Sequence, residues 1–501
     1  MFKRKIKLNY TAIIIFLVII SAIVFNILPQ RNINAAKPPR INGNISYTID
    51  EEFSFYENYI SGYKKNYILK AIGGYCNIWV EYNLHWNLFR DSEEDYILIA
   101  NKIDGIYKRM TDNIFSHAGS FGDIDNDGKI NILLSDLSKN LTSGYYSMVD
   151  IRETSETNNL DILYIDISKD YGYKNFKENN GMSFWFVIAH EFQHMLNDLA
   201  CNVITTKVDK NALWLNESLS SLAAYLYSLD TGTNIENSLL EYFLADYGTD
   251  NGFLYDEVEN TAQKEYLSGM LFGLYLNKQL HEINVIKKIY EQYSAGVYGV
   301  DAVENAVKGK FSSFEDLFDK FTIATYFDGI LSSSVYKILD TPIIYNSVEY
   351  DSLFKLRLKN DKLFSELNRN NVQLKSGFFN WSDKLMVYDK QVLENKQKFS
   401  MVGYDVIYYI ETNVSLENLN TNQSLKVYNA GEAESRFNSD SENILLLIIT
   451  KDNKIDTEII FSAVFPTEIV LAIVISVVLA AGLVATLIIY KKKRGQKMFK
   501  N

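Results

Sequence analysis

Two histidines spaced four residues apart in a strongly apolar segment constrain this chain more than any other feature. The segment SFWFVIAHEFQHML, residues 183–196, carries His190, Glu191 and His194 in the pattern H-E-x-x-H. Residues i and i+4 lie one turn apart on one face of a helix. Both imidazoles can therefore reach one metal ion at about 2.0–2.1 Å. Glu191 is one step round the helix, where its carboxylate can take a proton from metal-bound water without being a ligand.

A metal site of this kind needs a third ligand, because H-E-x-x-H also occurs on ordinary helices. The chain has five histidines, and two of them are in the motif, which makes a chance match uncommon. Glu217, in the segment WLNESLSSLAA, is the candidate, since the 22 residues that separate it from His194 allow a loop and an antiparallel helix. Two histidines and a glutamate leave one position of tetrahedral zinc for water, whose pKa falls to about 7. The alternative is that Glu217 is an exposed carboxylate on an amphipathic helix.

These two segments resemble the gluzincin metallopeptidases, which have a thermolysin-type arrangement. The pattern HEFQH followed by N-E-x-x-S carries the resemblance. The longer sequences AHEFQHML and WLNESLSSLAA are similar to the hyicolysin-like family. The resemblance covers residues 120–280 and implies a zincin-like domain with Glu191 as the base. The zinc ligands that it implies are His190, His194 and Glu217. Thermolysin has Asp after the serine of N-E-x-x-S, where it supports a histidine; here that residue is Ser221, so the imidazole must be oriented from elsewhere.

Peptide hydrolysis also requires a hydrogen-bond donor for the developing oxyanion. Gluzincins use a downstream tyrosine or histidine, and Tyr266 in QKEYLSGMLFGLYL is the candidate, with Tyr225 second. Because the chain has 35 tyrosines, a packing or surface role is the alternative for both. The strand expected at residues 161–168 is either the sheet edge that holds an extended substrate or an interior strand.

An acidic loop precedes a short apolar strand. Residues 122–130 match the D-x-[DN]-x-[DN]-G opening of a calcium loop, in which alternating carboxylates converge on one cation. Leu134 occupies the position where an EF-hand has glutamate, so the loop is not an EF-hand, and Asp136 is expected to complete the shell. The candidate calcium ligands are Asp123, Asp125, Asp127, Lys129 and Asp136. The alternative is a solvated acidic turn.

The two ends of the chain predict a membrane protein. Basic residues precede an apolar run at 11–28, which is typical of a signal peptide, and an uncleaved signal anchor is the alternative. A second run, residues 469–490, is uncharged over 22 residues and long enough to cross about 30 Å of hydrocarbon. Three lysines and an arginine follow it, which predicts a cytoplasmic tail. We therefore expect a single-pass protein of the cell membrane, anchored in the lipid bilayer, with most of the chain extracytoplasmic.

Charge and cysteine content exclude several classes of protein. The net charge is −12 and the pI is about 5.1, which argues against nucleic acid as a partner. Cys76 and Cys201 are the two cysteines, so a disulfide-rich scaffold and a cysteine-built zinc module are excluded. Whether these two cysteines form a disulfide is left open by the sequence.

Element patterns predict an α+β fold followed by an all-β, sandwich-like domain and a transmembrane helix. The short apolar runs at 130–137 and 161–168 are expected as strands. Helices are expected at 183–198, 212–228, 261–280, 282–293 and 314–328. Short strands are expected at 385–389, 399–411, 424–428, 443–451 and 457–464. The predicted division is a signal segment (1–36), a metallopeptidase domain (37–335), a β-rich domain (336–466), a membrane span (467–490) and a tail (491–501).

These features favour a membrane-anchored zinc metalloendopeptidase that acts on protein or peptide substrates, with zinc and a structural calcium ion as cofactors. An inactive zincin-fold protein used for surface binding or adhesion is the alternative, since the β-rich part is large. A zinc hydrolase that acts on another bond is a second alternative. The chain lacks the G-x-M-E-N motif of exopeptidases, which argues against an aminopeptidase.

Overall fold

The computed structural model describes residues 47–338, apart from gaps, and isolated elements between residues 343 and 462. The gaps are 59–62, 89–92, 116–126, 139–141, 152–156, 179–180, 201–212, 231–261, 281–283, 329 and 332. The later elements are 343–345, 348–350, 355–356, 359, 382–389, 398–402, 406–412, 426–429, 443–450 and 458–462. Within these ranges, no helix has both the length and the apolar character needed to cross a membrane. The predicted signal segment, membrane span and tail lie outside the described residues.

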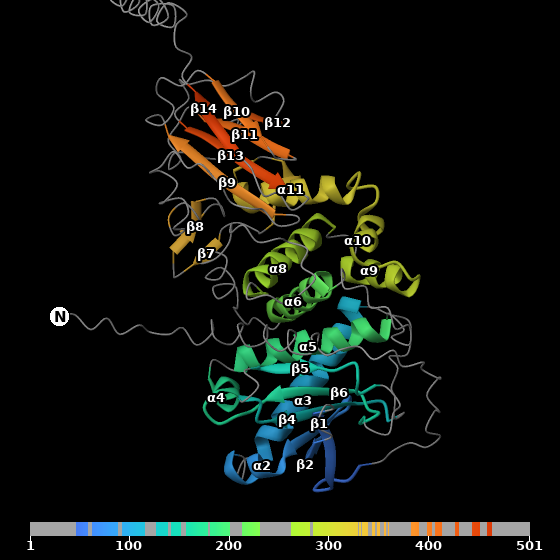
Figure 1. Cartoon of the computed structure of the whole chain (residues 1–501). Coiled ribbons are helices and arrows are strands. Elements are labelled where there is room, and N and C mark those ends of the chain that lie inside the picture. The colour runs from blue at the N-terminus through green and yellow to red at the C-terminus, as the bar shows by residue number, and fades with distance from the viewer. Residues whose placement is uncertain are drawn as a thin grey trace, which may run out of the picture.

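A mixed six-stranded sheet forms the base of the first part of the chain (Figure 1). Its order is β1-β2-β3-β4-β6-β5, with β3, β4 and β6 parallel and the other neighbours antiparallel. The strands are β1 (Glu52–Asn58), β2 (Tyr63–Ile72), β3 (Cys76–Glu81), β4 (Ile130–Ser135), β5 (Gly144–Tyr146) and β6 (Ile162–Asp166). The three parallel strands are almost continuously buried, as expected for strands that are covered on both faces.

The strand predicted at residues 161–168 is β6, and it is an interior strand. It pairs with β4 on one side and with β5 on the other. Its interpretation as the substrate-binding edge is therefore wrong. The edge strand on this side of the sheet is β5, which has three residues and no pattern that the sequence reveals.

Alternating side chains of the sheet build two cores. On β3, Ile78 and Val80 point into the larger core, whereas Trp79 points into a smaller aromatic one. The smaller core includes Phe55, whose ring lies 5.1 Å from that of Trp79 in an edge-to-face contact. The larger core faces helices α3 (Glu93–Arg109) and α5 (Met182–Ala200).

Helix α5 separates the sheet from a layer of further helices (Figure 1). Every side chain from Phe184 to Asn197 is buried, since the sheet covers one side of α5 and helices cover the other. The layer contains α6 (Leu213–Asp230), α8 (Ala262–Gln279), α9 (Val285–Ser294), α10 (Gly299–Val307) and α11 (Phe314–Phe327). Asn284 caps α9 by accepting from the Lys287 amide at 3.0 Å, and Ser313 caps α11 in the same way at 3.2 Å.

Two glycines of α8 allow α6 to pack closely against it. A Cβ atom on Gly269 would lie 2.5 Å from the Ser218 Oγ atom of α6. A Cβ atom on Gly273 would lie 3.1 Å from both the Ser218 carbonyl oxygen and the Leu222 Cβ atom. Because α6 also packs against α5, these contacts help to fix the position of α6 between its two neighbours.

The remaining described elements are short helices and the strands of the C-terminal part. The short elements are α2 (Tyr82–Leu88), η1 (Met110–Phe115), α4 (Gly172–Lys177), η5 (Ser334–Tyr336), β7 (Ile343–Tyr345) and β8 (Val348–Tyr350). The C-terminal strands are β9 (Ser382–Asp389), β10 (Lys398–Val402), β11 (Val406–Thr412), β12 (Lys426–Asn429), β13 (Asn443–Thr450) and β14 (Glu458–Ser462). They form one four-stranded and one two-stranded antiparallel sheet. The run predicted as one strand at 399–411 is divided between β10 and β11.

Candidate metal centre

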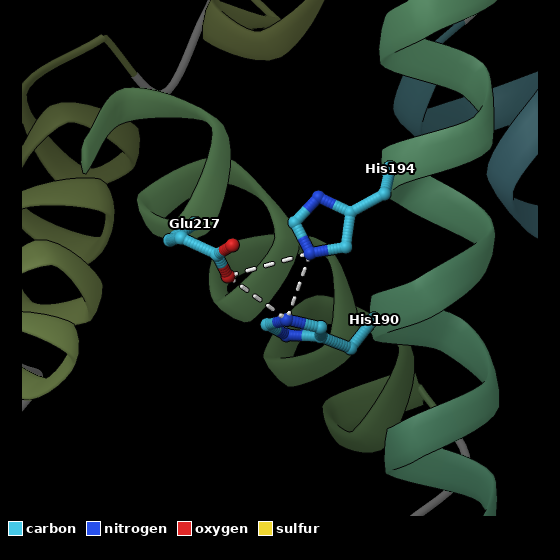
Figure 2. A group of neighbouring side chains, drawn as sticks. All are labelled: His190, His194 and Glu217. Atoms are coloured by element: carbon cyan, nitrogen blue, oxygen red, sulfur yellow. Dashed lines mark hydrogen bonds and ion pairs between the residues drawn. The ribbon is translucent and has the colours of Figure 1, made fainter. Parts of the chain in front are cut away.

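His190, His194 and Glu217 converge on one point between α5 and α6 (Figure 2). The two Nε2 atoms lie 3.1 Å apart, and each lies 3.3 Å from Oε2 of Glu217. All three residues are buried, with exposed fractions of 2%, 8% and 3%. Glu217 is thus a buried partner of both histidines, and its interpretation as an exposed surface carboxylate is wrong.

Local structure explains how the three groups meet. His190 and His194 are one turn apart on α5 and project from the same face. Glu217 lies in the first turns of α6, which packs directly against α5. No other set of three histidine, cysteine or acidic side chains in the described part of the chain could hold a metal ion.

The ligand atoms have the spacing of a zinc site. Around tetrahedral zinc with bonds of about 2.0–2.1 Å, neighbouring ligand atoms lie about 3.3–3.4 Å apart. The three separations here, 3.1, 3.3 and 3.3 Å, are close to that value. A donor set of two imidazole nitrogens and one carboxylate oxygen is suited to zinc and leaves a fourth position open. The residues present therefore fit the ion.

Electrostatics favour positive charge at this point. Burial raises the pKa of Glu217, but the neighbouring histidines outweigh it and hold the pKa at about 2. Burial lowers the pKa of His194, but the Glu217 carboxylate outweighs it and raises the pKa to about 9. The buried carboxylate thus stays ionised and attracts a cation, and a divalent metal ion satisfies the same demand.

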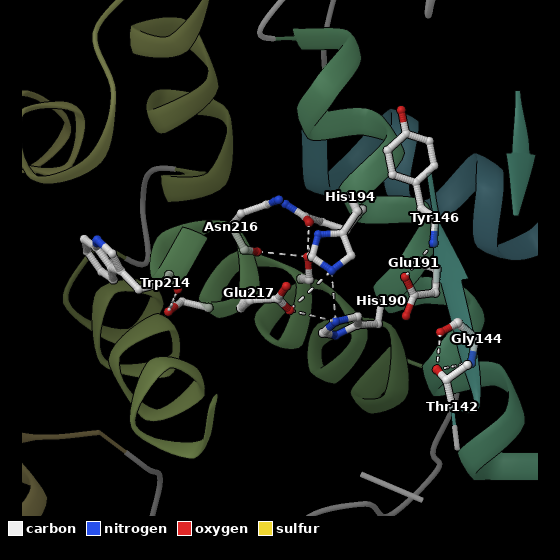
Figure 3. Close-up of polar contacts among 12 residues, drawn as sticks. Thr142, Gly144, Tyr146, His190, Glu191, His194, Trp214, Asn216 and Glu217 are labelled. Atoms are coloured by element: carbon white, nitrogen blue, oxygen red, sulfur yellow. Dashed lines mark hydrogen bonds and ion pairs between the residues drawn. The ribbon is translucent and has the colours of Figure 1, made fainter. Parts of the chain in front are cut away.

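Glu191 lies beside the three ligands and is held by the sheet (Figure 3). Its Oε2 atom accepts a hydrogen bond from the Tyr146 backbone amide of β5 at 3.1 Å. Burial raises the pKa of the Glu191 carboxyl group, and the nearby His190 and His194 partly offset that rise. A buried carboxylate with a raised pKa is a better proton acceptor than an exposed one.

The outward backbone groups of the edge strand β5 are engaged near Glu191 (Figure 3). Besides the Tyr146 amide, the Gly144 carbonyl accepts a hydrogen bond from Oγ1 of Thr142 at 2.7 Å. A Cβ atom on Gly144 would lie 2.7 Å from Cγ1 of Val187, so the missing side chain lets α5 approach the strand. This close approach brings the strand to Glu191.

The sequence did not show which residue orients an imidazole of the site. In the structure it is Ser220, not Ser221, that contacts one of the two rings. Its Oγ atom lies 3.0 Å from Nδ1 of His194. Among the described residues, Nδ1 of His190 has no hydrogen-bond partner. The two histidines are therefore held unequally, since among the described residues Nδ1 of His194 has a hydrogen-bond partner and Nδ1 of His190 has none.

The two candidate oxyanion donors stay predictions. Tyr266 lies in α8, but its side chain is outside the described part of the structure. Tyr225 is buried on α6, two turns after Glu217, which corresponds to about 12 Å along the helix axis.

The acidic loop is only partly described, because Asp123 and Asp125 lie outside the described residues. Asp127 accepts hydrogen bonds from Nδ2 of Asn77 and from the Lys129 amide, both at 2.8 Å. Nζ of Lys129 donates to the carbonyl oxygens of Gly73 and Gly74. Calcium binding by Asp123, Asp125, Asp127 and Lys129 therefore stays a prediction.

Asp136 does not belong to the same ion site as Asp127. The two residues lie at opposite ends of β4, whose six residues rise about 3.3 Å each and separate them by about 20 Å. One cation binds its oxygen ligands at about 2.3–2.6 Å. Asp136 instead accepts hydrogen bonds from the amide and hydroxyl of Ser138. Its assignment as a calcium ligand is therefore wrong.

Cys76 is a free, buried thiol that contacts the Ala100 carbonyl oxygen and Asp104, each at 3.6 Å. Cys201 lies outside the described residues.

A buried His-His-Glu cluster with an adjacent glutamate is a donor set suited to a metal ion, and a comparison with curated proteins finds a metalloprotease. Over 252 residues the chain is 26% identical to the neutral metalloprotease ShpI of Staphylococcus hyicus. The match takes in 48% of this chain and 53% of the relative, so the chain spans about half the length of that protein. No family model matches the chain.

Proposed function

We propose that this protein is a zinc metalloendopeptidase of the hyicolysin-like group of gluzincins. The observation that carries the proposal is the triangle of His190, His194 and Glu217 next to the buried carboxylate of Glu191. The similarity to a neutral metalloprotease supports the same class of reaction. Protein or peptide chains are the substrates that this class implies.

The three ligands would hold zinc, which lowers the pKa of water to about 7 and so supplies a nucleophile at neutral pH. Glu191 accepts the proton of the attacking water and later returns it to the leaving amine. The Tyr146 amide keeps the Glu191 carboxylate turned toward the ligands while this proton is held. Tyr266 is proposed as the donor to the oxyanion.

An extended peptide beside β5 would place its scissile bond near Glu191. The support is that β5 is the edge of the sheet, is packed against α5 and contacts the base. A peptide that pairs with this edge must displace the hydroxyl of Thr142 from the Gly144 carbonyl. Substrate backbone binding is therefore an exchange of hydrogen bonds.

The proposed location is the outer side of the cell membrane, with residues 467–490 as the anchor. The support is the uncharged run and the basic residues that follow it. A structural calcium ion in the acidic loop is part of the proposal and rests on the alternating carboxylates of residues 123–127.

Metal analysis combined with proteolysis of a peptide library tests this function. We expect one zinc per chain and hydrolysis within peptides that a chelator abolishes and added zinc restores. Glu191→Gln keeps the shape of the side chain but loses the base, so it should retain zinc and lose hydrolysis. Full activity in Glu191→Gln would contradict the mechanism. A zinc-loaded chain that cleaves no peptide would instead favour a binding or adhesion protein.

A further inference from the structure

A continuous chain of buried hydrogen bonds links α9 to the metal ligand His194. Tyr290 of α9 receives a hydrogen bond from Nε2 of Gln193, and Oε1 of Gln193 receives one from the hydroxyl of Ser220. Oγ of Ser220 lies 3.0 Å from Nδ1 of His194. Each of these residues is at most 8% exposed.

The polar ends of Gln193 are both satisfied in this arrangement. A buried amide without partners costs free energy, so its presence in a fully buried position requires an explanation. Gln193 is adjacent to the ligand His194 on α5 but points away from the metal, toward α9. It connects Ser220 with Tyr290 and leaves neither end of the amide without a partner.

The single proton of the Ser220 hydroxyl determines the tautomer of His194. Two carbonyl oxygens accept from this hydroxyl, Oε1 of Gln193 and, at 2.9 Å, the Asn216 backbone oxygen. When the proton is used toward either, the Ser220 oxygen can only accept from His194, so Nδ1 of His194 carries hydrogen. In the neutral imidazole that a metal ion requires, the lone pair is then on Nε2, which is the atom that faces Glu217.

We propose that Ser220, Gln193 and Tyr290 form a positioning relay that sets the tautomer and ring orientation of His194 for zinc. The inference rests on the proposed zinc site and goes beyond it, because none of the three residues touches the metal position. His190 provides an internal contrast, since its Nδ1 atom has no partner among the described residues. The relay therefore makes His194 the more rigidly held of the two histidines.

Zinc affinity of the full chain, measured by competition with a chelator of known affinity, tests the relay. Ser220→Ala removes a hydrogen-bond acceptor for Nδ1 and should weaken zinc binding by roughly 10- to 100-fold. Ser218→Ala is the matched control, because Ser218 is a buried serine of the same helix whose hydroxyl bonds only the Trp214 carbonyl, at 2.7 Å. The control should keep the affinity of the unsubstituted chain to within about 2-fold.

Tyr290→Phe tests the far end of the relay with almost no change in volume. We expect a loss of zinc affinity of about 5-fold, because the relay is loosened rather than broken next to the ligand. Tyr275→Phe is its control: the Tyr275 hydroxyl bonds the Val335 carbonyl at 2.7 Å, outside the relay. In the double variant Ser220→Ala/Tyr290→Phe, the second change should add nothing, because Tyr290 then has no connection to His194.

The outcomes separate the relay from the proposed function. If the unsubstituted chain binds zinc and cleaves peptides but Ser220→Ala binds zinc as tightly as Ser218→Ala, the relay is wrong and the function stands. Additive losses in the double variant also overturn the relay, since they place Tyr290 on another route. If the unsubstituted chain binds no zinc, both the proposed function and the relay are wrong. Thermal unfolding in excess chelator shows whether each metal-free variant is folded.

Discussion

The Tyr146 backbone amide donates to the Glu191 carboxylate over 3.1 Å, so a sheet edge holds the proposed general base. The neighbouring Ser143 carbonyl accepts from the Asp166 amide of β6. Because backbone groups alternate along a strand, the Tyr146 amide points away from the sheet. It is thus available to Glu191 without loss of a bond between strands.

Proline at position 146 should therefore lower activity without opening the sheet. Proline is tolerated at edge strands where the amide faces outward. Tyr146→Pro therefore removes the amide that donates to Glu191 and leaves the hydrogen bonds between β5 and β6 in place. Tyr146→Ala also loses the ring but keeps the amide and is the control. We expect kcat/KM of the proline variant to be about 10-fold below that of the alanine variant, since charge-assisted hydrogen bonds contribute about 1.5–3 kcal/mol. Equal activity in both variants would exclude the amide from catalysis.

Removal of zinc should destabilise the chain, because the proposed ion would join α5 to α6. A ligand at 1,000 times its dissociation constant adds about 4 kcal/mol, which corresponds to about 10 °C in Tm for a domain of this size. Differential scanning calorimetry with and without chelator measures the shift. Glu217→Gln loses the anionic ligand and should unfold at the same temperature in both conditions. A chelator effect of equal size in Glu217→Gln would show that the ion binds elsewhere.

Asp166 should make stability fall between pH 4 and pH 6. Burial raises its pKa from 3.8 to about 6, although hydrogen bonds from Leu137 and Ser168 partly offset that effect. A carboxyl group whose pKa is higher in the folded chain binds more protons there, so stability is lost as pH rises through the folded value. The loss is at most about 3 kcal/mol.

Urea unfolding at several pH values measures this loss. Asp166→Asn has no carboxyl proton to release, so its free energy of unfolding should not decrease in this way between pH 4 and pH 6. Glu349→Gln, at an exposed carboxylate of β8, is the control and should follow the unsubstituted chain. An unchanged pH profile in Asp166→Asn would assign the dependence to another group.

Alanine should have opposite effects at two helical glycines. In α3, a Cβ atom on Gly105 has no neighbour within 4 Å, so Gly105→Ala should stabilise the chain by about 1 kcal/mol through helix propensity. In α8, Gly273→Ala meets backbone and side-chain atoms of α6 at 3.1 Å and should cost about 1–3 kcal/mol through overpacking. Chemical unfolding compares the two. Stabilisation by Gly273→Ala would show that α6 and α8 can separate freely.

The helices that carry the ligands were predictable because their signals are local. An apolar run containing H-E-x-x-H indicated residues 183–198, and α5 spans Met182–Ala200. The segment WLNESLSSLAA indicated residues 212–228, and α6 spans Leu213–Asp230. Helical spacing accounts for the two histidines, whereas the arrival of Glu217 beside them depends on the packing of α6 against α5.

Features that depend on distant parts of the chain were not predictable. The edge strand β5 has three residues, too few for any alternation of polar and apolar side chains to be seen. Ser220 and Tyr290 act on His194 from other helices, and Tyr290 is far from it in sequence. Asp136 was misassigned because the extended strand β4 lies between it and Asp127, so two residues that are close in sequence are far apart in space.

The short edge at β5 also bears on how the folded chain avoids unwanted association. Exposed strand edges are templates on which foreign strands and other copies of a protein can aggregate. Here the outward carbonyl of Gly144 and the outward amide of Tyr146 are already bonded within the molecule, to Thr142 and Glu191. A foreign strand therefore gains few hydrogen bonds by pairing with β5, unless it also interacts with His190, His194 or Glu217. The same two internal bonds that arrange the site thus protect it from indiscriminate self-assembly.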